Sequence, residues 1–170
     1  MSYPIPPPAF DHPEYQRHHH WMSRAIALAD AAGQRGDVPV GAIVVDPNNK
    51  LIAEGQNNRE GGQDPTAHAE IVALRAAGQV RRSWRLTDCT LYVTLEPCPM
   101  CAGAVILSRI STVVYGADDV KTGAARTAIN LFDGPWSNHS PRVIGGILEE
   151  PCRQQLQTWF ESRRRERHHA

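Results

Sequence analysis

The sequence lacks the features that mark a membrane protein or a secreted one. Its longest apolar stretches fall well short of the roughly 18 residues that a transmembrane helix needs. The N-terminus has neither the basic start nor the apolar run of a signal peptide. Net charge is also absent, because 18 Lys and Arg residues balance 18 Asp and Glu residues, so composition gives no reason to expect a nucleic-acid partner. We expect a cytoplasmic protein that does not bind a membrane.

Cysteine is scarce, with four residues among 170. Cys98 and Cys101 form a C-x-x-C pair, which in an intracellular chain indicates metal binding or redox chemistry more than a disulfide framework. Cys89 begins a predicted strand and Cys152 a predicted helix, so we expect both to be buried apolar residues. The length and the 41% hydrophobic content suit one globular domain with a real core.

The hydrophobic pattern predicts one α/β domain behind a proline-rich arm. Residues 1–14 hold five of the 13 prolines and are expected to be disordered, whereas residues 15–167 form the domain. The predicted helices span residues 16–34, a segment that starts at Asp64, a segment from Pro97 or Pro99 to Arg109, and residues 151–165. The predicted strands span residues 40–45, 50–54, 90–95, 112–117 and 143–148. Residues 57–63 are predicted to form a loop. The first two strands should form an antiparallel hairpin. The later strand–helix–strand order implies parallel pairing, so the sheet is mixed and has helices on both faces.

A histidine and the cysteine pair each follow a helix-start signal. Cys98 and Cys101 are three residues apart, so both thiols lie on one side of a first helical turn, whose free N–H groups and dipole favour thiolate. His68 and Glu70 point about 200° apart around a helix, so both can reach a metal only if it lies beyond the helix N-terminus. Two thiolates and one imidazole are good zinc ligands. The sequence therefore predicts a zinc ion held by His68, Cys98 and Cys101.

Three protein ligands leave the fourth zinc position to water, since no further Cys or His has suitable local spacing. Zinc lowers the pKa of such a water to about 7. Glu70 is the nearby carboxylate that can take the proton and pass it on. We favour a catalytic zinc site over a structural one or a thiol redox pair, because the two motifs occur together on two helix starts separated by a strand.

H-x-E followed by P-C-x-x-C is the signature of the zinc nucleobase deaminases. Over about residues 15 to 167 the chain resembles, more closely, the bacterial tRNA-specific adenosine deaminases. The stretches that carry this resemblance are residues 38–42, 64–71, 91–98, 100–104 and 121–125. It implies a cytidine-deaminase-like three-layer αβα fold with a central mixed five-stranded sheet. It also implies a homodimer with one zinc ion per subunit, which converts adenosine to inosine at the wobble position of a tRNA anticodon and releases ammonia.

The same resemblance assigns roles to individual residues. His68, Cys98 and Cys101 would be the zinc ligands and Glu70 the proton shuttle. Residues that would bind the target nucleoside or the anticodon loop are Asn57, Asp119, Lys121 and Asn138. A C-terminal helix bearing Trp159, Phe160, Arg163 and Arg164 would lie against the RNA. Residues 153–170 hold five Arg and two Glu, a local charge of +3 that the neutral total conceals.

Two alternatives remain open from the residues alone. The first is a deaminase of a free base or nucleotide, such as guanine, cytosine or deoxycytidylate, which would use the same zinc chemistry without needing an Arg-rich terminal helix. The second is a non-catalytic RNA-binding module stabilised by zinc. Glu70 argues against the second, because a structural zinc site has no use for an unliganded carboxylate beside the metal.

Overall fold

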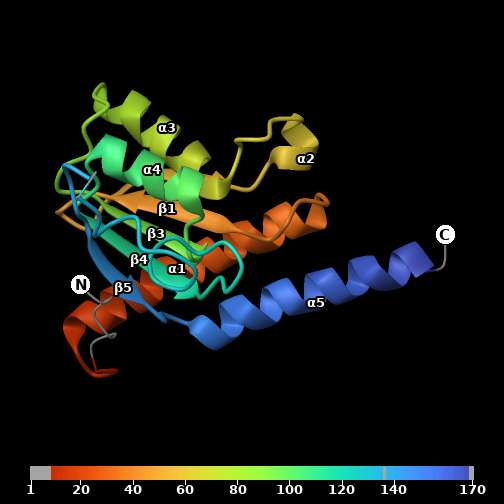
Figure 1. Cartoon of the computed structure of the whole chain (residues 1–170). Coiled ribbons are helices and arrows are strands. Elements are labelled where there is room, and N and C mark those ends of the chain that lie inside the picture. The colour runs from red at the N-terminus through yellow and green to blue at the C-terminus, as the bar shows by residue number, and fades with distance from the viewer. Residues whose placement is uncertain (1–8, 136, 169–170) are drawn as a thin grey trace.

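A five-stranded sheet lies between two layers of helices in the computed structural model, which describes residues 9–135 and 137–168 (Figure 1). The strands are β1 (Gly41–Val45), β2 (Leu51–Gln56), β3 (Thr90–Leu95), β4 (Thr112–Ala117) and β5 (Arg142–Gly145). The helices are α1 (Pro13–Gln34), α2 (Arg59–Gly62), α3 (Ala69–Arg81), α4 (Pro99–Ser108) and α5 (Glu149–His168). The predicted α/β class with a mixed sheet is confirmed.

The sheet has the strand order β2-β1-β3-β4-β5. The predicted hairpin is confirmed, since β1 pairs antiparallel with β2, and β1 also runs antiparallel to β3. β4 lies parallel to both β3 and β5. The carboxyl ends of β3 and β4 therefore meet at one edge of the sheet, and the loops that follow them lie side by side.

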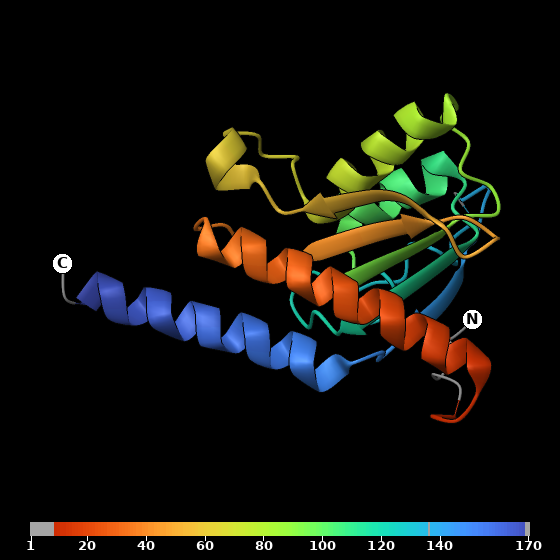
Figure 2. The same ribbon diagram turned by 180° about the vertical axis from the view of Figure 1, so that it is seen from behind.

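Each face of the sheet carries its own hydrophobic core, because successive side chains of a strand point to opposite faces. In β1, Ala42 and Val44 join the core under α3 and α4, whereas Ile43 and Val45 join the core under α1 and α5. This explains why all five residues of β1 are buried. Figure 2 shows α1 and α5 side by side on the second face, with the C-terminal part of α5 extending beyond the rest of the protein.

The strands predicted over 90–95 and 112–117 have the observed bounds, but the starts of three helices differ. α1 begins at Pro13, where His12 caps it by accepting a hydrogen bond from the Glu14 amide at 3.1 Å. Residues 13–14 of the predicted arm are therefore helical, and residues 1–8 lie outside the described residues. The last helix is also longer than predicted, because it includes residues 149–150 and 166–168.

The helix predicted from Asp64 is present as α3, but its predicted start is wrong. Asp64 Oδ1 accepts hydrogen bonds from the amide of Thr66 at 2.8 Å and from its hydroxyl at 2.7 Å. An aspartate side chain that bonds its own backbone two residues on stabilises a turn as well as a helix start. Here it forms a turn, and α3 begins only at Ala69.

The described parts of the chain contain no helix that is both long and apolar enough to cross a membrane.

Candidate metal centre and substrate pocket

His68 and Cys98 occupy the same structural position, the N-cap of α3 and the N-cap of α4. Both have extended backbones, with ψ of 152° and 171°, and neither side chain makes a capping hydrogen bond. Both side chains are thus available as ligands. Because His68 is not helical, the expected 200° separation from Glu70 around the helix does not apply. The extended backbone lets its imidazole reach the end of the helix.

The three predicted ligands lie together. His68 Nδ1 is 3.6 Å from the Sγ atoms of both Cys98 and Cys101, and the three ligand atoms all lie within 4.8 Å of one another. Zn–S bonds of about 2.3 Å and Zn–N bonds of about 2.0 Å in a tetrahedron separate nitrogen from sulfur by about 3.5 Å. The donor set and its spacing therefore fit zinc. No other His, Cys, Asp or Glu of residues 9–135 and 137–168 joins the group.

The two thiols share a hydrogen bond that favours one thiolate. The bond from Cys101, together with one from His68, lowers the pKa of Cys98 to about 4 despite burial. The same bond to Cys98, with burial, raises the pKa of Cys101. Hydrogen bonding to Cys98 also raises the pKa of His68. A thiolate at the N-terminus of α4 is the form of cysteine that binds metals.

Glu70 is the second residue of α3 and only 4% exposed. Burial raises the pKa of its carboxyl to about 7, far above the ordinary value of 4.5. A carboxyl with a pKa near the working pH is suited to accept a proton and then release it. Glu70 lines the same pocket as His68 and Cys98, so its position and its pKa suit a general acid–base role beside the metal ligands.

The pocket above the ligands has a volume of about 120 Å³. This is smaller than the roughly 300–1,000 Å³ of pockets that enclose drug-sized ligands, so it suits a single ring system. Its lining residues are Val38, Val40, Asn57, Arg59, His68, Ala69, Glu70, Leu95, Glu96, Cys98, Asp119 and Thr122.

Asn57 presents an unused acceptor in this pocket. It is buried, its Nδ2 donates to the carbonyl of Val38 at 3.2 Å, and its Oδ1 has no hydrogen-bond partner among the described residues. A buried acceptor without a partner is costly unless a ligand supplies the donor. The structure thus places Asn57 where it can hold an N–H or O–H group of a substrate.

Asp119 also lines the pocket, but its carboxylate is engaged within its own loop. Asp119 Oδ1 accepts from the amides of Lys121 at 2.9 Å and Thr122 at 3.1 Å, and Oδ2 accepts from the Thr122 hydroxyl at 2.6 Å. Lys121 is exposed and lies outside the pocket, in a groove beside α5.

A basic groove of about 650 Å³ adjoins the pocket and shares Val38, Asn57 and Arg59 with it. Its arginines are Arg35, Arg59, Arg163, Arg164 and Arg167. Phe160, 43% exposed, and Arg164 also line the neighbouring groove of about 530 Å³ that contains Lys121. The predicted RNA-facing residues of α5 therefore line grooves beside the pocket, although they follow its last lining residue, Thr122, by 37 to 42 positions in the chain.

The residues of α5 differ in their freedom to contact a ligand. Trp159 Nε1 donates to the Gly33 carbonyl at 3.2 Å and so attaches α5 to α1. Arg163 stacks 5.2 Å from the Trp159 ring and pairs with Glu166 at 3.0 Å. Within the described residues, Arg164 has no ion pair. Arg164 is thus the least constrained of the predicted pair.

Asn138 is not brought to the pocket. Its Oδ1 accepts a hydrogen bond from Arg109, the C-cap of α4. α4 starts at the metal ligands, and its ten residues rise about 1.5 Å each. Asn138 therefore lies at the other end of α4, some 15 Å from the metal ligands. The structure therefore does not bring Asn138 together with the pocket residues, and its contact with the anticodon loop stays a prediction.

Two charged residues of the pocket were not predicted from the sequence. Arg59 stands in a polar segment expected to be a loop and instead begins α2. Glu96 directly follows the buried strand β3 and is 1% exposed. The only sequence signal for Glu96 is its position directly before Pro97-Cys98, and Arg59 has none.

Comparison with known proteins agrees with this geometry. The model of the cytidine and deoxycytidylate deaminase zinc-binding region matches residues 15–117. The tRNA-specific adenosine deaminase of Haemophilus influenzae is 49% identical over 146 residues, which cover 86% of this chain and 84% of the relative. The enzyme of that name from Bacillus subtilis is 45% identical over 147 residues, 86% and 91% of the two chains.

Solved structures of related enzymes share the fold. A protein from studies of A-to-I editing by tRNA:A34 deaminases superposes with a TM-score of 0.78 at 40% identity, covering 81% of this chain and 99% of that one. A guanine deaminase from Nitrosomonas europaea gives 0.71 at 26% identity, with 83% of each chain covered. The family match spans more than half of the chain and includes all three predicted ligands and Glu70. The chain therefore belongs to the cytidine and deoxycytidylate deaminase family.

Proposed function

We propose that this chain deaminates adenosine to inosine at the wobble position of a tRNA anticodon, with release of ammonia. The observation that carries this proposal is a small pocket, with a zinc-type donor set and a buried carboxyl, that opens into an arginine-lined groove. The pocket has room for a base, and the groove can take the nucleic acid that bears it. The relatives named tRNA-specific adenosine deaminases support the same substrate.

The chain's own residues account for the proton transfers. A zinc ion held by His68, Cys98 and Cys101 would make a water molecule nucleophilic near neutral pH. Hydrolysis forms a carbon–oxygen bond at C6 of adenine and breaks the bond to the exocyclic nitrogen. One proton of the water passes to ring N1 and the other to the departing nitrogen, which leaves as ammonia. Glu70, within the pocket and with a pKa of about 7, carries these protons.

Asn57 orients the target nucleoside in this scheme. Its free Oδ1 accepts a hydrogen bond from the base or the ribose, while the Val38 carbonyl fixes the amide. The base must leave its stack to enter the pocket, as in other enzymes that react with nucleobases. The exposed ring of Phe160 offers a stacking surface for a neighbouring base, and Arg59, Arg164 and Lys121 offer cations for phosphates.

A deaminase of a free base is the second candidate, favoured by the structural match to a guanine deaminase. The pocket alone would serve such a substrate. The basic groove continuous with the pocket favours RNA, because a free base has no phosphate for five arginines to contact.

The surface of α3 and α4, on the face of the sheet opposite α1, supports a homodimer. α3 and α4 enclose an apolar groove of about 740 Å³, beside which Leu107 is 72% and Trp84 56% exposed. Exposed apolar patches of this kind mark association surfaces. We propose that a second copy covers this groove. We also propose that each subunit holds one zinc ion and that the protein acts in the cytoplasm. Leu107→Asp should convert a dimer to monomers in sedimentation velocity, and an unchanged dimer would assign the interface elsewhere.

The deciding experiment uses a tRNA with adenosine at the wobble position. Purified protein loaded with zinc should form inosine, detected by nucleoside analysis after digestion. Parallel incubations with guanine, cytosine and deoxycytidylate test the second candidate. Turnover of one of these without inosine in the tRNA would replace the proposed function by the alternative.

A further inference from the structure

Glu96 is a buried carboxylate that the proposed reaction does not use. It stands between β3 and the ligand Cys98, two residues away, and its side chain is 1% exposed. It lines the substrate pocket together with Glu70 and Asn57. A buried carboxylate is costly unless hydrogen bonds compensate it, so its partners indicate its role.

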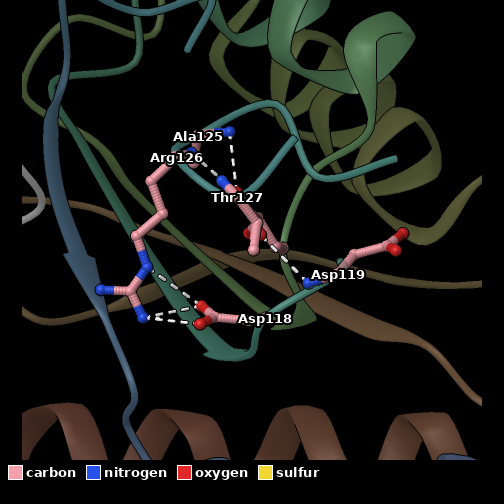
Figure 3. Close-up of polar contacts among 6 residues, drawn as sticks. Asp118, Asp119, Ala125, Arg126 and Thr127 are labelled. Atoms are coloured by element: carbon pink, nitrogen blue, oxygen red, sulfur yellow. Dashed lines mark hydrogen bonds and ion pairs between the residues drawn. The ribbon is translucent and has the colours of Figure 1, made fainter. Parts of the chain in front are cut away.

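Within the part of the chain that the structure describes, the hydrogen-bond partners of its side chain all come from residues 118–127, which we call the wall loop. Glu96 Oε1 accepts hydrogen bonds from three successive amides, those of Ala125 at 3.0 Å, Arg126 at 2.8 Å and Thr127 at 3.1 Å. Glu96 Oε2 accepts from the amide of Asp119 at 3.0 Å and from the hydroxyl of Thr127. Figure 3 shows the loop folding around these contacts. Hydrogen bonds to a carboxylate are about twice as strong as neutral ones, so Glu96 holds both ends of the wall loop.

The middle of the wall loop also packs directly on this carboxylate. A Cβ at Gly123 would overlap the Glu96 carboxylate and the Asp119 carbonyl, so only glycine fits there. The Gly123 amide donates to the Asp119 carbonyl at 2.8 Å, and the Ala124 amide donates to the Pro97 carbonyl at 2.8 Å. The loop is therefore clamped to the segment that carries the metal ligands.

The wall loop forms one side of the pocket. Asp119 and Thr122 line it together with Asn57, and the hydrogen bonds between Asp119 and Thr122 keep this turn rigid. Lys121, between them, lines the groove beside α5. A displacement of the wall loop would change the width of the pocket and the position of Lys121 together.

We propose that Glu96 is a positioning residue for substrate: it fixes the wall loop against the metal-ligand segment, so that the nucleoside is held between Asn57 and the turn of Asp119 and Thr122. This inference rests on the proposed function for its substrate. Glu96 itself touches neither the reacting atoms nor the metal in this scheme. Its loss should thus impair substrate binding and leave metal binding intact.

Glu96→Gln tests the inference with almost no change in size. The amide nitrogen of glutamine would face N–H donors, so one side of the loop loses its acceptor. We expect an unchanged zinc content and a roughly 10–100-fold lower kcat/KM on an anticodon stem-loop, most of it in KM. Hydrogen exchange at the amides of residues 125–127 should accelerate, while exchange within β3 stays slow. Glu54→Gln, the same change at a partly exposed residue of β2 that pairs with Arg24, is the matched control and should behave as wild type.

Gly123→Ala moves the loop from its other side. It should raise KM and accelerate the same amide exchange. The fold-loss of kcat/KM in the double variant with Glu96→Gln should be smaller than the product of the two single fold-losses, because both changes release the same contact. If Glu96→Gln does not fold, Gly123→Ala decides. Wild-type KM together with wild-type exchange at residues 125–127 would overturn the inference. Absence of inosine formation by the wild type would instead refute the proposed function, and amide exchange would then decide on Glu96 alone.

Discussion

Replacing Glu70 by glutamine separates proton transfer from metal binding. The amide has nearly the same shape but cannot accept the proton of water. Loss of general acid–base catalysis typically lowers rates by about 10²–10⁴-fold. We expect turnover to fall by about 10⁴-fold, the upper end of this range, because Glu70 carries several proton transfers. Zinc content should remain at the wild-type level, since the ligand atoms of His68, Cys98 and Cys101 are a complete set without Glu70.

The same substitution should change stability in a pH-dependent way. Burial raises the pKa of Glu70 from 4.5 to about 7 in the folded protein, so the folded state binds the proton more tightly than the unfolded state. Stability from this group is therefore full below pH 4.5 and is lost as the pH rises through 7. The difference corresponds to about 3 kcal/mol. Glutamine carries no charge at any pH, so the metal-free variant should exceed the wild type by up to that amount in alkaline solution and match it in acid.

The assays are inosine formation, zinc content by elemental analysis, and urea unfolding of chelator-treated protein at several pH values. Chelation is needed because bound zinc adds its own stability. Turnover within tenfold of wild type would refute the proton-transfer role. Loss of zinc would make Glu70 a ligand, and a stability gain independent of pH would refute the assigned cause of the raised pKa.

Three further predictions concern the ligands, the nucleoside and the RNA. His68→Ala should lower zinc content and the free energy of unfolding together, because metal binding and folding are coupled; a variant with full zinc would remove His68 from the ligand set. Asn57→Ala should reduce turnover and leave the Kd for tRNA nearly unchanged in a filter-binding assay, since Asn57 holds only the nucleoside; equal losses in both would place it in the RNA interface. The double variant Arg163→Ala, Arg164→Ala should bind tRNA with a shallower salt dependence: the slope of log binding constant against log salt concentration should fall in magnitude by about one to two. Arg165→Ala, on the same helix but outside both grooves, is the control and should leave the slope unchanged, and identical slopes for all variants would show that α5 does not contact phosphates.

Local spacing was sufficient to predict the metal centre. Cys98 and Cys101 are three residues apart at a helix start, and His68 stands at another, so short stretches of chain specify each half. The strand over 90–95 was predictable for a similar reason, because alternating apolar residues, here Leu91, Val93 and Leu95, are typical of a strand. The starts of helices were harder to predict, because the Asp64 side chain can accept the same kind of hydrogen bond from the backbone in a helix cap and in a turn.

Only the tertiary structure decided which distant residues share the pocket. Parallel pairing of β3 and β4 places the wall loop beside Cys98, which makes Glu96 a hydrogen-bond acceptor for residues 23 to 31 positions away. Packing of α5 on α1 places Arg164 beside the groove. Asn138, which was also predicted to contact RNA, lies at the far end of α4. The sequence by itself determined the chemistry of the site, because ligand type and short spacing are local properties. The shape of the pocket and its surroundings depended on strand order and helix packing, which arise from contacts between residues far apart in the chain.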